Sequence, residues 1–403
     1  MSNSVMAGYR ELPRLVGIWH MVISFFGRLP ISMIIIGVLT LIVNATDSVE
    51  IAAYCSAALA ISNAVGNVLI GRLTDRYGQR RPLLAIAPIN VIALLSLVMA
   101  TRANAPSAVL VGLSALIGVS TCPIGPLTRV RWYPLASSHQ LPAAMSWETV
   151  NDELVFVLGP AAVGILAAAI HPAAPLVISA LLVATCVIPF ALSRFALPPA
   201  ISATHTPSFA RIMRRIRTPF ITMWCMGMFF GAMQTSVTAF AKDHGIAVMG
   251  GLIYSAMGLS AAITALLAVG LPARMSHVTR IWMGGIGLAG GALLCVCAHH
   301  VALLAVFLFI AGLFIGPVGV AIFTLAGQWA PRGGDGVANT AIVSANVLGV
   351  ATANTLIGKA LESHLSLGFM MAAGFGLAMM LVALSFGRYD EHHLRAVAVE
   401  SGR

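Results

Sequence analysis

The chain has 403 residues, of which 59% are hydrophobic and only 9% are charged, and its formal net charge is +10. Its mean hydropathy is +0.93. A water-soluble domain of this length cannot bury so large an apolar fraction, so the composition excludes a soluble protein and indicates an integral membrane protein.

Twelve apolar stretches are long enough to cross a bilayer, because a spanning helix needs roughly 20 residues. The first stretch is too long for a signal peptide, so we expect an uncleaved helix there. The predicted fold class is an all-α integral membrane protein with 12 transmembrane helices. The predicted spans are 15–43, 51–71, 82–101, 107–128, 143–170, 173–193, 219–241, 249–271, 281–298, 301–326, 337–360 and 366–387.

Basic residues are distributed unevenly over the loops that join these spans. With the N-terminus placed in the cytoplasm, nearly all of the 23 Lys and Arg residues fall in cytoplasmic loops and tails, the exceptions being Arg28, Arg102, Lys242 and Lys359. This bias predicts a multi-pass protein of the cytoplasmic (inner or plasma) membrane with both termini in the cytoplasm. The net charge therefore reflects topology in a lipid bilayer, and we expect no nucleic-acid partner.

The first predicted span carries an arginine near its middle, Arg28, in the stretch FFGRLPISM. A charge at the bilayer centre costs on the order of 2.5–3.5 kcal/mol on insertion scales, so such a residue is rarely idle. We expect Arg28 to take part in substrate binding or proton coupling. The alternative is a structural ion pair that joins two helices.

A short charged loop, GRLTDRYGQRR, lies between the second and third predicted spans. It resembles the signature loop of the major facilitator superfamily, Gly-x-Leu-Ala-Asp-Arg-x-Gly-Arg-Lys/Arg. Thr74 replaces the usual Ala, and Gln79 replaces a usual Arg. The matching residues are Gly71, Leu73, Asp75, Arg76, Gly78 and Arg80.

The resemblance implies a latch on the cytoplasmic side that holds an outward-open state. In the superfamily the loop carboxylate faces the N-terminus of helix eleven, which would place Asp75 near Gly336, where the helix dipole favours an anion. Gly71 would allow close helix contact and Gly78 a tight turn. The alternative is a basic loop that only sets topology. The loop cations expected to bind carboxylates or lipid phosphates are Arg76 and Arg80.

The fifth predicted span contains three acids in MSWETVNDELVFVLGP. Glu148 and Asp152 are four residues apart and share a helix face, whereas Glu153 is turned by about 100° from Asp152. We expect Asp152 and Glu153 to form a proton-coupling site close to Arg28, with structural ion pairs as an equally weighted alternative.

Glu148 lies only one or two turns from the inner end of this span. We therefore expect it to pair with Arg129 or Arg131 and to close the cytoplasmic gate beside Asp75.

The stretch LGPAAVGIL in the same span resembles the antiporter motif of drug-exporting members, whose core reads Gly-Pro-x-x-Gly-Gly. Gly159, Pro160 and Gly164 match, whereas Val163 replaces a glycine and the upstream glycines are missing. The fourth span also lacks the mid-span Arg typical of proton-coupled exporters. The motif thus favours export without establishing it.

A polar connection at residues 194–218 divides the chain into two sets of six predicted spans. Its second part, SFARIMRRIRT, is basic and amphipathic, and we expect it to lie along the anionic inner leaflet. Gly-Pro pairs recur at Gly125 and Gly316 in the fourth and tenth spans, as a duplicated unit would require. The predicted organisation is two pseudo-symmetric halves, 1–193 and 219–387, with a linker at 194–218 and a cytoplasmic tail at 388–403.

The remaining polar features point to no cofactor. Gln234, in the middle of the seventh span, is a candidate substrate contact, with an interhelical hydrogen bond as the alternative. The six cysteines all lie in apolar spans, so we expect neither a disulfide framework nor a metal site. The chain contains no nucleotide-binding or hydrolase motif, and we expect no enzymatic activity.

These features predict a secondary active transporter that works by alternating access, and we expect proton-coupled efflux (antiport) of a small molecule. Uptake of a sugar or organic acid by proton symport is the first alternative, and a membrane sensor that does not transport is the second. The expected partners are a small-molecule substrate, protons and the lipid bilayer, and we expect a monomer.

Overall fold

The computed structural model describes residues 2–137, 139–199, 207–246, 250–272, 275–361 and 365–387. Within these residues the regular structure is entirely helical, and 12 helical segments are long and apolar enough to cross a membrane. The predicted fold class is therefore confirmed. The predicted tail, residues 388–403, lies outside the described residues.

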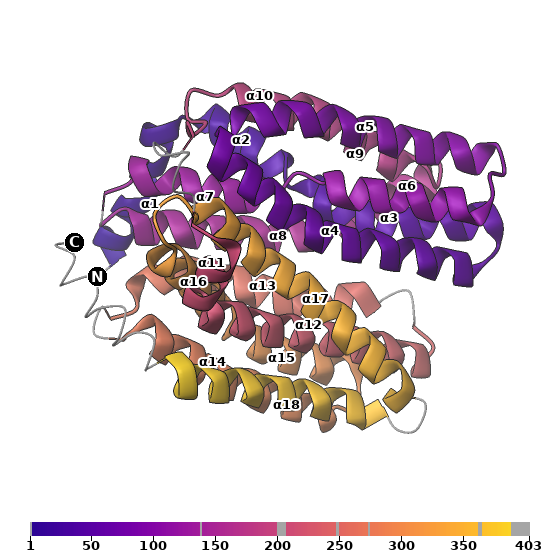
Figure 1. Ribbon diagram of the computed structural model, residues 1–403. Coiled ribbons are helices and arrows are strands. Elements are labelled where there is room, and N and C mark those ends of the chain that lie inside the picture. Colours follow the sequence, from indigo (N-terminus) through magenta and orange to yellow (C-terminus); the bar gives the residue numbers. More distant parts are fainter. Residues whose placement is uncertain are drawn as a thin grey trace.

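The helices form two bundles that lie side by side (Figure 1). The first bundle contains α1 Ser2–Val16, α2 Ile18–Phe26, α3 Leu29–Thr46, α4 Val49–Tyr77, α5 Arg80–Arg102, α6 Ser107–Ser120, α7 Ile124–Leu135, α8 Leu141–Ala169, α9 Ala174–Leu182, a π-helical turn Val183–Val187 and α10 Ile188–Leu192.

A short helix, α11 Phe209–Arg215, connects to the second bundle. This bundle contains α12 Arg217–Asp243, α13 Gly250–Leu267, a 3₁₀ turn Ala268–Gly270, α14 His277–Val296, α15 Val301–Gly312, α16 Ile315–Trp329, α17 Asp335–Leu361, α18 Leu365–Val382 and a π-helical turn Ala383–Gly387.

The bundles meet along two helix pairs, α4 with α17 and α8 with α13. Hydrogen bonds between the bundles lie toward one end, where α1, α11 and the loop after α4 gather at the left of Figure 1. We call this the linker end. Among the described residues these bonds join Tyr9 to Leu266, Asp75 to Gly336 and Val337, Tyr133 to Asn339 and Ala64 to Ser344.

Three of the spans are interrupted rather than continuous. The first breaks at Gly27 and Arg28, between α2 and α3, where Pro30 lacks the N–H needed to continue the helix. The fourth breaks at residues 121–123, because Thr121 is extended and Pro123 cannot continue α6. The tenth breaks between α15 and α16. Breaks of this kind are tolerated in a bilayer only where the freed backbone is buried in protein or lines a cavity.

The fourth span ends later than its sequence suggests. The predicted end at residue 128 is wrong, because α7 continues to Leu135 and includes Arg129 and Arg131. Both arginines are almost fully buried, at 0% and 1% exposure. In a hydropathy profile such charges predict a loop, but here both arginines have partners inside the protein.

Helix α11 has a buried apolar face and an exposed basic face. Ile212 and Ile216 are buried against Val337 and Ala341 of α17. Arg211 and Arg214 on the opposite face are exposed. The predicted amphipathic segment therefore forms, but its apolar face covers the linker end of α17 rather than entering lipid.

Candidate functional site

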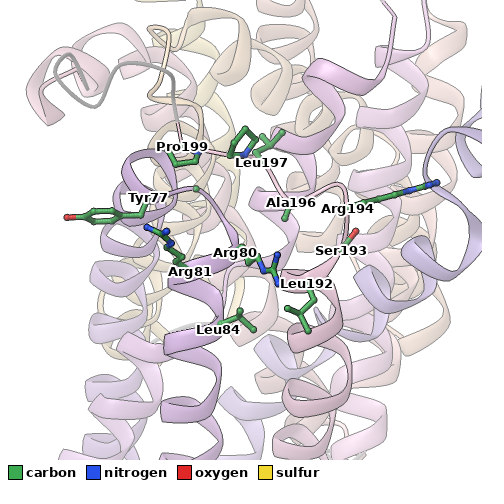
Figure 2. Close-up of a pocket in the computed structure, with 12 residues that line it drawn as sticks. Tyr77, Arg80, Arg81, Leu84, Leu192, Ser193, Arg194, Ala196, Leu197 and Pro199 are labelled. Atoms are coloured by element: carbon green, nitrogen blue, oxygen red, sulfur yellow. The ribbon is translucent and has the colours of Figure 1, made fainter.

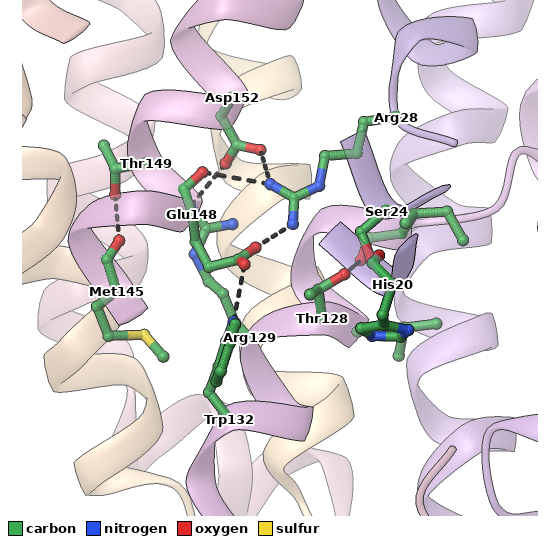
Figure 3. A network of polar contacts seen from close by, with 12 residues as sticks. His20, Ser24, Arg28, Thr128, Arg129, Trp132, Met145, Glu148, Thr149 and Asp152 are labelled. Atoms are coloured by element: carbon green, nitrogen blue, oxygen red, sulfur yellow. Dashed lines mark hydrogen bonds and ion pairs between the residues drawn. The ribbon is translucent and has the colours of Figure 1, made fainter. Parts of the chain in front are cut away.

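Arg28 lies at the break in the first span and forms ion pairs with two acids of α8. One guanidinium nitrogen, Nη2, pairs with Glu148, and Nη1 donates to Asp152 Oδ1 at 3.2 Å. Nη1 also lies 3.3 Å from the backbone oxygen of Glu148. Arg28 is 3% exposed, so these acids replace the hydration that the cation loses on burial (Figure 3).

A second arginine, Arg129 of α7, completes the group. Its Nη2 donates to Asp152 Oδ2 at 2.6 Å, and its guanidinium stacks over the ring of Phe323 in α16, 3.7 Å from the centroid. Two cations and two carboxylates thus balance in charge. We call Arg28, Arg129, Glu148 and Asp152 the central cluster.

The two acids of the cluster differ in accessibility. Glu148 is 1% exposed and accepts a further hydrogen bond from Trp132 Nε1 at 2.8 Å. Asp152 is 28% exposed. The prediction that Glu148 pairs with Arg129 or Arg131 at the cytoplasmic gate is wrong. The break in the first span brings Arg28 onto the same α8 face, and Arg129 binds Asp152 instead.

Glu153 is turned away from the cluster toward the other bundle. Among the described residues it forms no ion pair or hydrogen bond, and it lies within electrostatic reach of Tyr254 on α13. Because α8 and α13 pack against each other across the bundle interface, Glu153 is a carboxylic acid placed between the two bundles.

The other predicted site residues lie apart from the cluster. Gly159 packs so closely on Ser32 of α3 that a side chain could not be accommodated without a shift. Gly164 has open space around it, so close packing does not account for that glycine. Gln234 is exposed on α12, and the structure does not bring it near the charged residues of the first bundle.

The loop after α4 contacts the second bundle through Asp75. Its Oδ1 accepts from the backbone N–H of Gly336 at 2.8 Å and its Oδ2 from that of Val337 at 2.9 Å. These donors belong to the first turn of α17, where the helix dipole favours an anion. Asp75 therefore lies where the resemblance placed it. Its action as a latch stays a prediction.

The two glycines of this loop are each required by a different feature of the backbone. A Cβ on Gly71 would clash with Thr340 and lie 2.9 Å from the backbone oxygen of Gly336, so only glycine allows α4 and α17 to approach this closely. Gly78 has φ +76° and joins α4 to α5 in a conformation that other residues rarely adopt. Arg76 and Arg80 are exposed, and the structure describes no ion pair for either.

Gln79, which departs from the family pattern, connects this loop to α7. Its Nε2 donates to the backbone oxygen of Leu127 at 3.1 Å, and its Oε1 accepts from Arg131 Nε at 2.6 Å. Arg131 also stacks over Phe190, 3.4 Å from the ring centroid. Helix α7 therefore binds the loop through Arg131 and the central cluster through Arg129 and Trp132.

A groove of about 600 Å³ lies beside this loop, between the start of α5 and the segment after α10 (Figure 2). Its lining includes Arg80, Arg81 and Arg194 together with Leu84 and Leu192. The groove is at the linker end, whereas the central cluster lies at the span breaks.

Sequence reasoning missed Arg129 and Trp132 as members of the cluster. Arg129 stands at the predicted end of a span, where arginines ordinarily mark the membrane surface. Pro123 was the available signal, because a break there lets a new helix start within the membrane and continue past the predicted end.

Two packed six-span bundles with broken spans around buried charges are the architecture of a secondary membrane transporter. The family model of the Major Facilitator Superfamily matches residues 21–353. The chain therefore belongs to this superfamily. No match was found among the curated proteins.

Solved structures of superfamily transporters share the fold. The human organic anion transporter MFSD10 (TETRAN) aligns with a TM-score of 0.73 at 13% identity, over 92% of this chain and 99% of that chain. The transporter FucP in its outward conformation aligns at 0.68 and 13% identity, over 93% and 98%. A structure of the E. coli fucose:proton symporter FucP aligns at 0.67 and 13% identity, over 92% and 98%. At this identity the likeness concerns the fold alone.

Proposed function

We propose that this chain is a monomeric secondary active transporter that moves a small molecule across the cytoplasmic membrane by alternating access, driven by protons. The observation that carries the proposal is the central cluster, in which two buried arginines hold two carboxylates at the breaks of the first and fourth spans. Charges inside a membrane are costly and usually mark a substrate or proton pathway.

Two acids of α8, Asp152 and Glu153, are the candidates for the proton carrier, and the stronger of the two is Glu153. Its carboxyl group has no cationic partner among the described residues, unlike Asp152 and Glu148, each of which is bound by arginine. An acid without such a partner can be neutral when buried and ionised when exposed to water. Its position between α8 and α13 would change its surroundings whenever the two bundles rock.

The hydrogen bonds between the bundles support an outward-open assignment. They gather at the linker end, and the positive-inside rule assigns that end, with both chain termini, to the cytoplasm. In this proposal the contact of Asp75 with the first turn of α17 latches the cytoplasmic side and opens when the transporter turns inward.

Different observations favour the two possible directions of transport. Efflux by antiport is favoured by the likeness of Gly159, Pro160 and Gly164 to the helix-five motif of exporters. Uptake by symport is favoured by the two cluster arginines, which suit an anionic substrate. Two of the aligned structures are an organic anion transporter and a fucose:proton symporter.

The test is the internal pH of proteoliposomes under an imposed proton gradient, with drugs, sugars and organic acids added singly. We expect a substrate-dependent proton movement that is lost in Glu153→Gln and kept in the control Asp243→Asn, whose side chain is 76% exposed. The direction of proton movement separates antiport from symport. Substrate flux without proton movement would contradict the coupling, and binding without flux would indicate a sensor.

A further inference from the structure

The Cβ position of Gly125, in the first turn of α7, is surrounded by polar atoms. A carbon placed at its Cβ position would lie 3.1 Å from Asp152 Oδ1 and 3.7 Å from both Arg129 Nη1 and Arg28 Nε, and these are the nearest atoms. A larger residue would bring its side chain against these atoms. The glycine therefore keeps a side chain away from the point where two arginines of the central cluster and Asp152 come together.

Two of these surrounding atoms are donors without acceptors. Among the described residues, neither Arg28 Nε nor Arg129 Nη1 has a hydrogen-bond partner, although Arg28 is 3% and Arg129 0% exposed. A buried charged donor left unpaired is costly, because it has lost its hydration without gaining an acceptor. Both donors lie 3.7 Å from the Cβ position of Gly125, which suggests that an acceptor belongs beside it.

Helix ends add to the positive potential at this point. Helix α7 begins at Ile124 and α3 begins at Leu29, so the first turns of both helices adjoin the cluster. The N-terminal turn of a helix carries a partial positive charge and unpaired backbone N–H groups. Paired half-helix ends of this kind suit the anionic group of a substrate.

We propose that the space beside Gly125 is a subsite for an oxygen of an organic anion, a carboxylate by preference, and that this anion binds together with a proton on Asp152. The inference rests on the proposed transport function and refines its substrate class. The anion would accept hydrogen bonds from Arg28 Nε and Arg129 Nη1, and the substrate body would extend toward the bundle interface.

The proton is required by charge balance. The cluster is neutral with Asp152 ionised, and an entering anion would lie next to Asp152 Oδ1. Protonation of Asp152 removes one negative charge and converts this acceptor into a third donor. The charged groups that surround Asp152 are Arg28 and Arg129 from neighbouring helices and Glu148 and Glu153 from α8. Across the interface, α13 contributes Tyr254 near Glu153.

The subsite is tested by thermal unfolding of the purified full-length protein in detergent. The added probes are carboxylates, sulfonates and phosphate monoesters, and each anion is compared with the corresponding neutral amide or alcohol. We expect at least one carboxylate to raise the unfolding midpoint, more strongly at low pH, while its amide does not. Equal effects of the amide, or no effect of any anion, would overturn the inference.

Two variants locate the binding. Gly125→Ala should weaken binding of the effective carboxylate at least about tenfold, because its methyl group occupies the subsite. Gly112→Ala, in the same span but with open space around its Cβ position, should bind as the parent does. Asp152→Asn, which imitates the protonated acid, should bind with little dependence on pH. Undiminished binding by Gly125→Ala would place the anion elsewhere.

Flux measurements separate this inference from the proposed function. Carboxylate binding without any flux into proteoliposomes would reject transport but keep the subsite. Transport of a neutral molecule that is unaffected by Gly125→Ala would reject the subsite but keep transport.

Discussion

The contact at Asp75 and the central cluster both hold carboxylates in the protein, but they do so with different partners. Asp75 is bound by two backbone N–H groups of the opposite bundle, so its partners carry only the partial charge of a helix end. The cluster carboxylates are bound by full charges from the same bundle.

This difference bears on which contact can change during transport. Separating Asp75 from α17 exposes a half-buried carboxylate and some backbone groups to water, at modest cost. Separating the cluster would leave buried charges unpaired, at a cost of several kcal/mol. In the proposed transport cycle the Asp75 contact is therefore the one suited to open, whereas we expect the cluster to change only when a proton or substrate alters its charge.

The largest effect is expected for Arg28→Ala, which leaves Glu148 and Asp152 without their shared cation. Removing one partner of a buried ion pair costs about 3–5 kcal/mol, so thermal unfolding in detergent should show a much lower midpoint and flux should be lost. Arg102→Ala, an exposed arginine at the opposite end, is the control. The double variant Arg28→Ala/Glu148→Gln should recover part of the stability; no recovery would argue against a charge mechanism.

Gly71→Ala should disrupt the contact between α4 and α17, because the added methyl meets Thr340 and the backbone of Gly336. We expect a large shift toward the state in which the linker end is open. The readout is maleimide labelling of Ser344→Cys, since Ser344 donates to the backbone oxygen of Ala64 across the interface. Labelling equal to that of the parent with the same reporter would show that the helices adapt without parting.

Asp75→Asn should also shift the protein toward the state in which the linker end is open, but by a smaller amount than Gly71→Ala. Asparagine keeps a hydrogen-bond acceptor but loses the negative charge. Losing charge-assisted hydrogen bonds of this kind costs roughly 1.5–3 kcal/mol. The expected result is faster labelling of Ser344→Cys together with altered transport. If labelling and transport were both unchanged, the latch role of this loop would be rejected.

The smallest effect is expected for Gln79→Ala, which removes two hydrogen bonds between the loop and α7 without unbalancing charge. A loss of about 1–2 kcal/mol should lower the unfolding midpoint by a few degrees. Substrate affinity should be retained, because the central cluster keeps its own partners. A strong loss of affinity would instead show that the loop and the cluster are coupled through Arg131.

Part of this architecture could be predicted from local sequence because its signals are local. Apolar length predicted the spans, since the bilayer requires roughly 20 apolar residues whatever their neighbours are. The loop motif predicted that Asp75 meets the start of α17. The partners of Glu148 could not be predicted in this way, because the choice between Arg28, Arg129 and Arg131 depends on how α7 and α8 are rotated.

The sequence by itself determined the membrane class, the number of spans, the contact of Asp75 with the start of α17 and the presence of buried charge, because composition and short motifs carry these directly. Only the tertiary structure decided that Arg129 enters the cluster and that Gly125 adjoins two unpaired guanidinium donors. These features depend on packing between helices distant in sequence, and a buried charge is stable only where such packing supplies its partners.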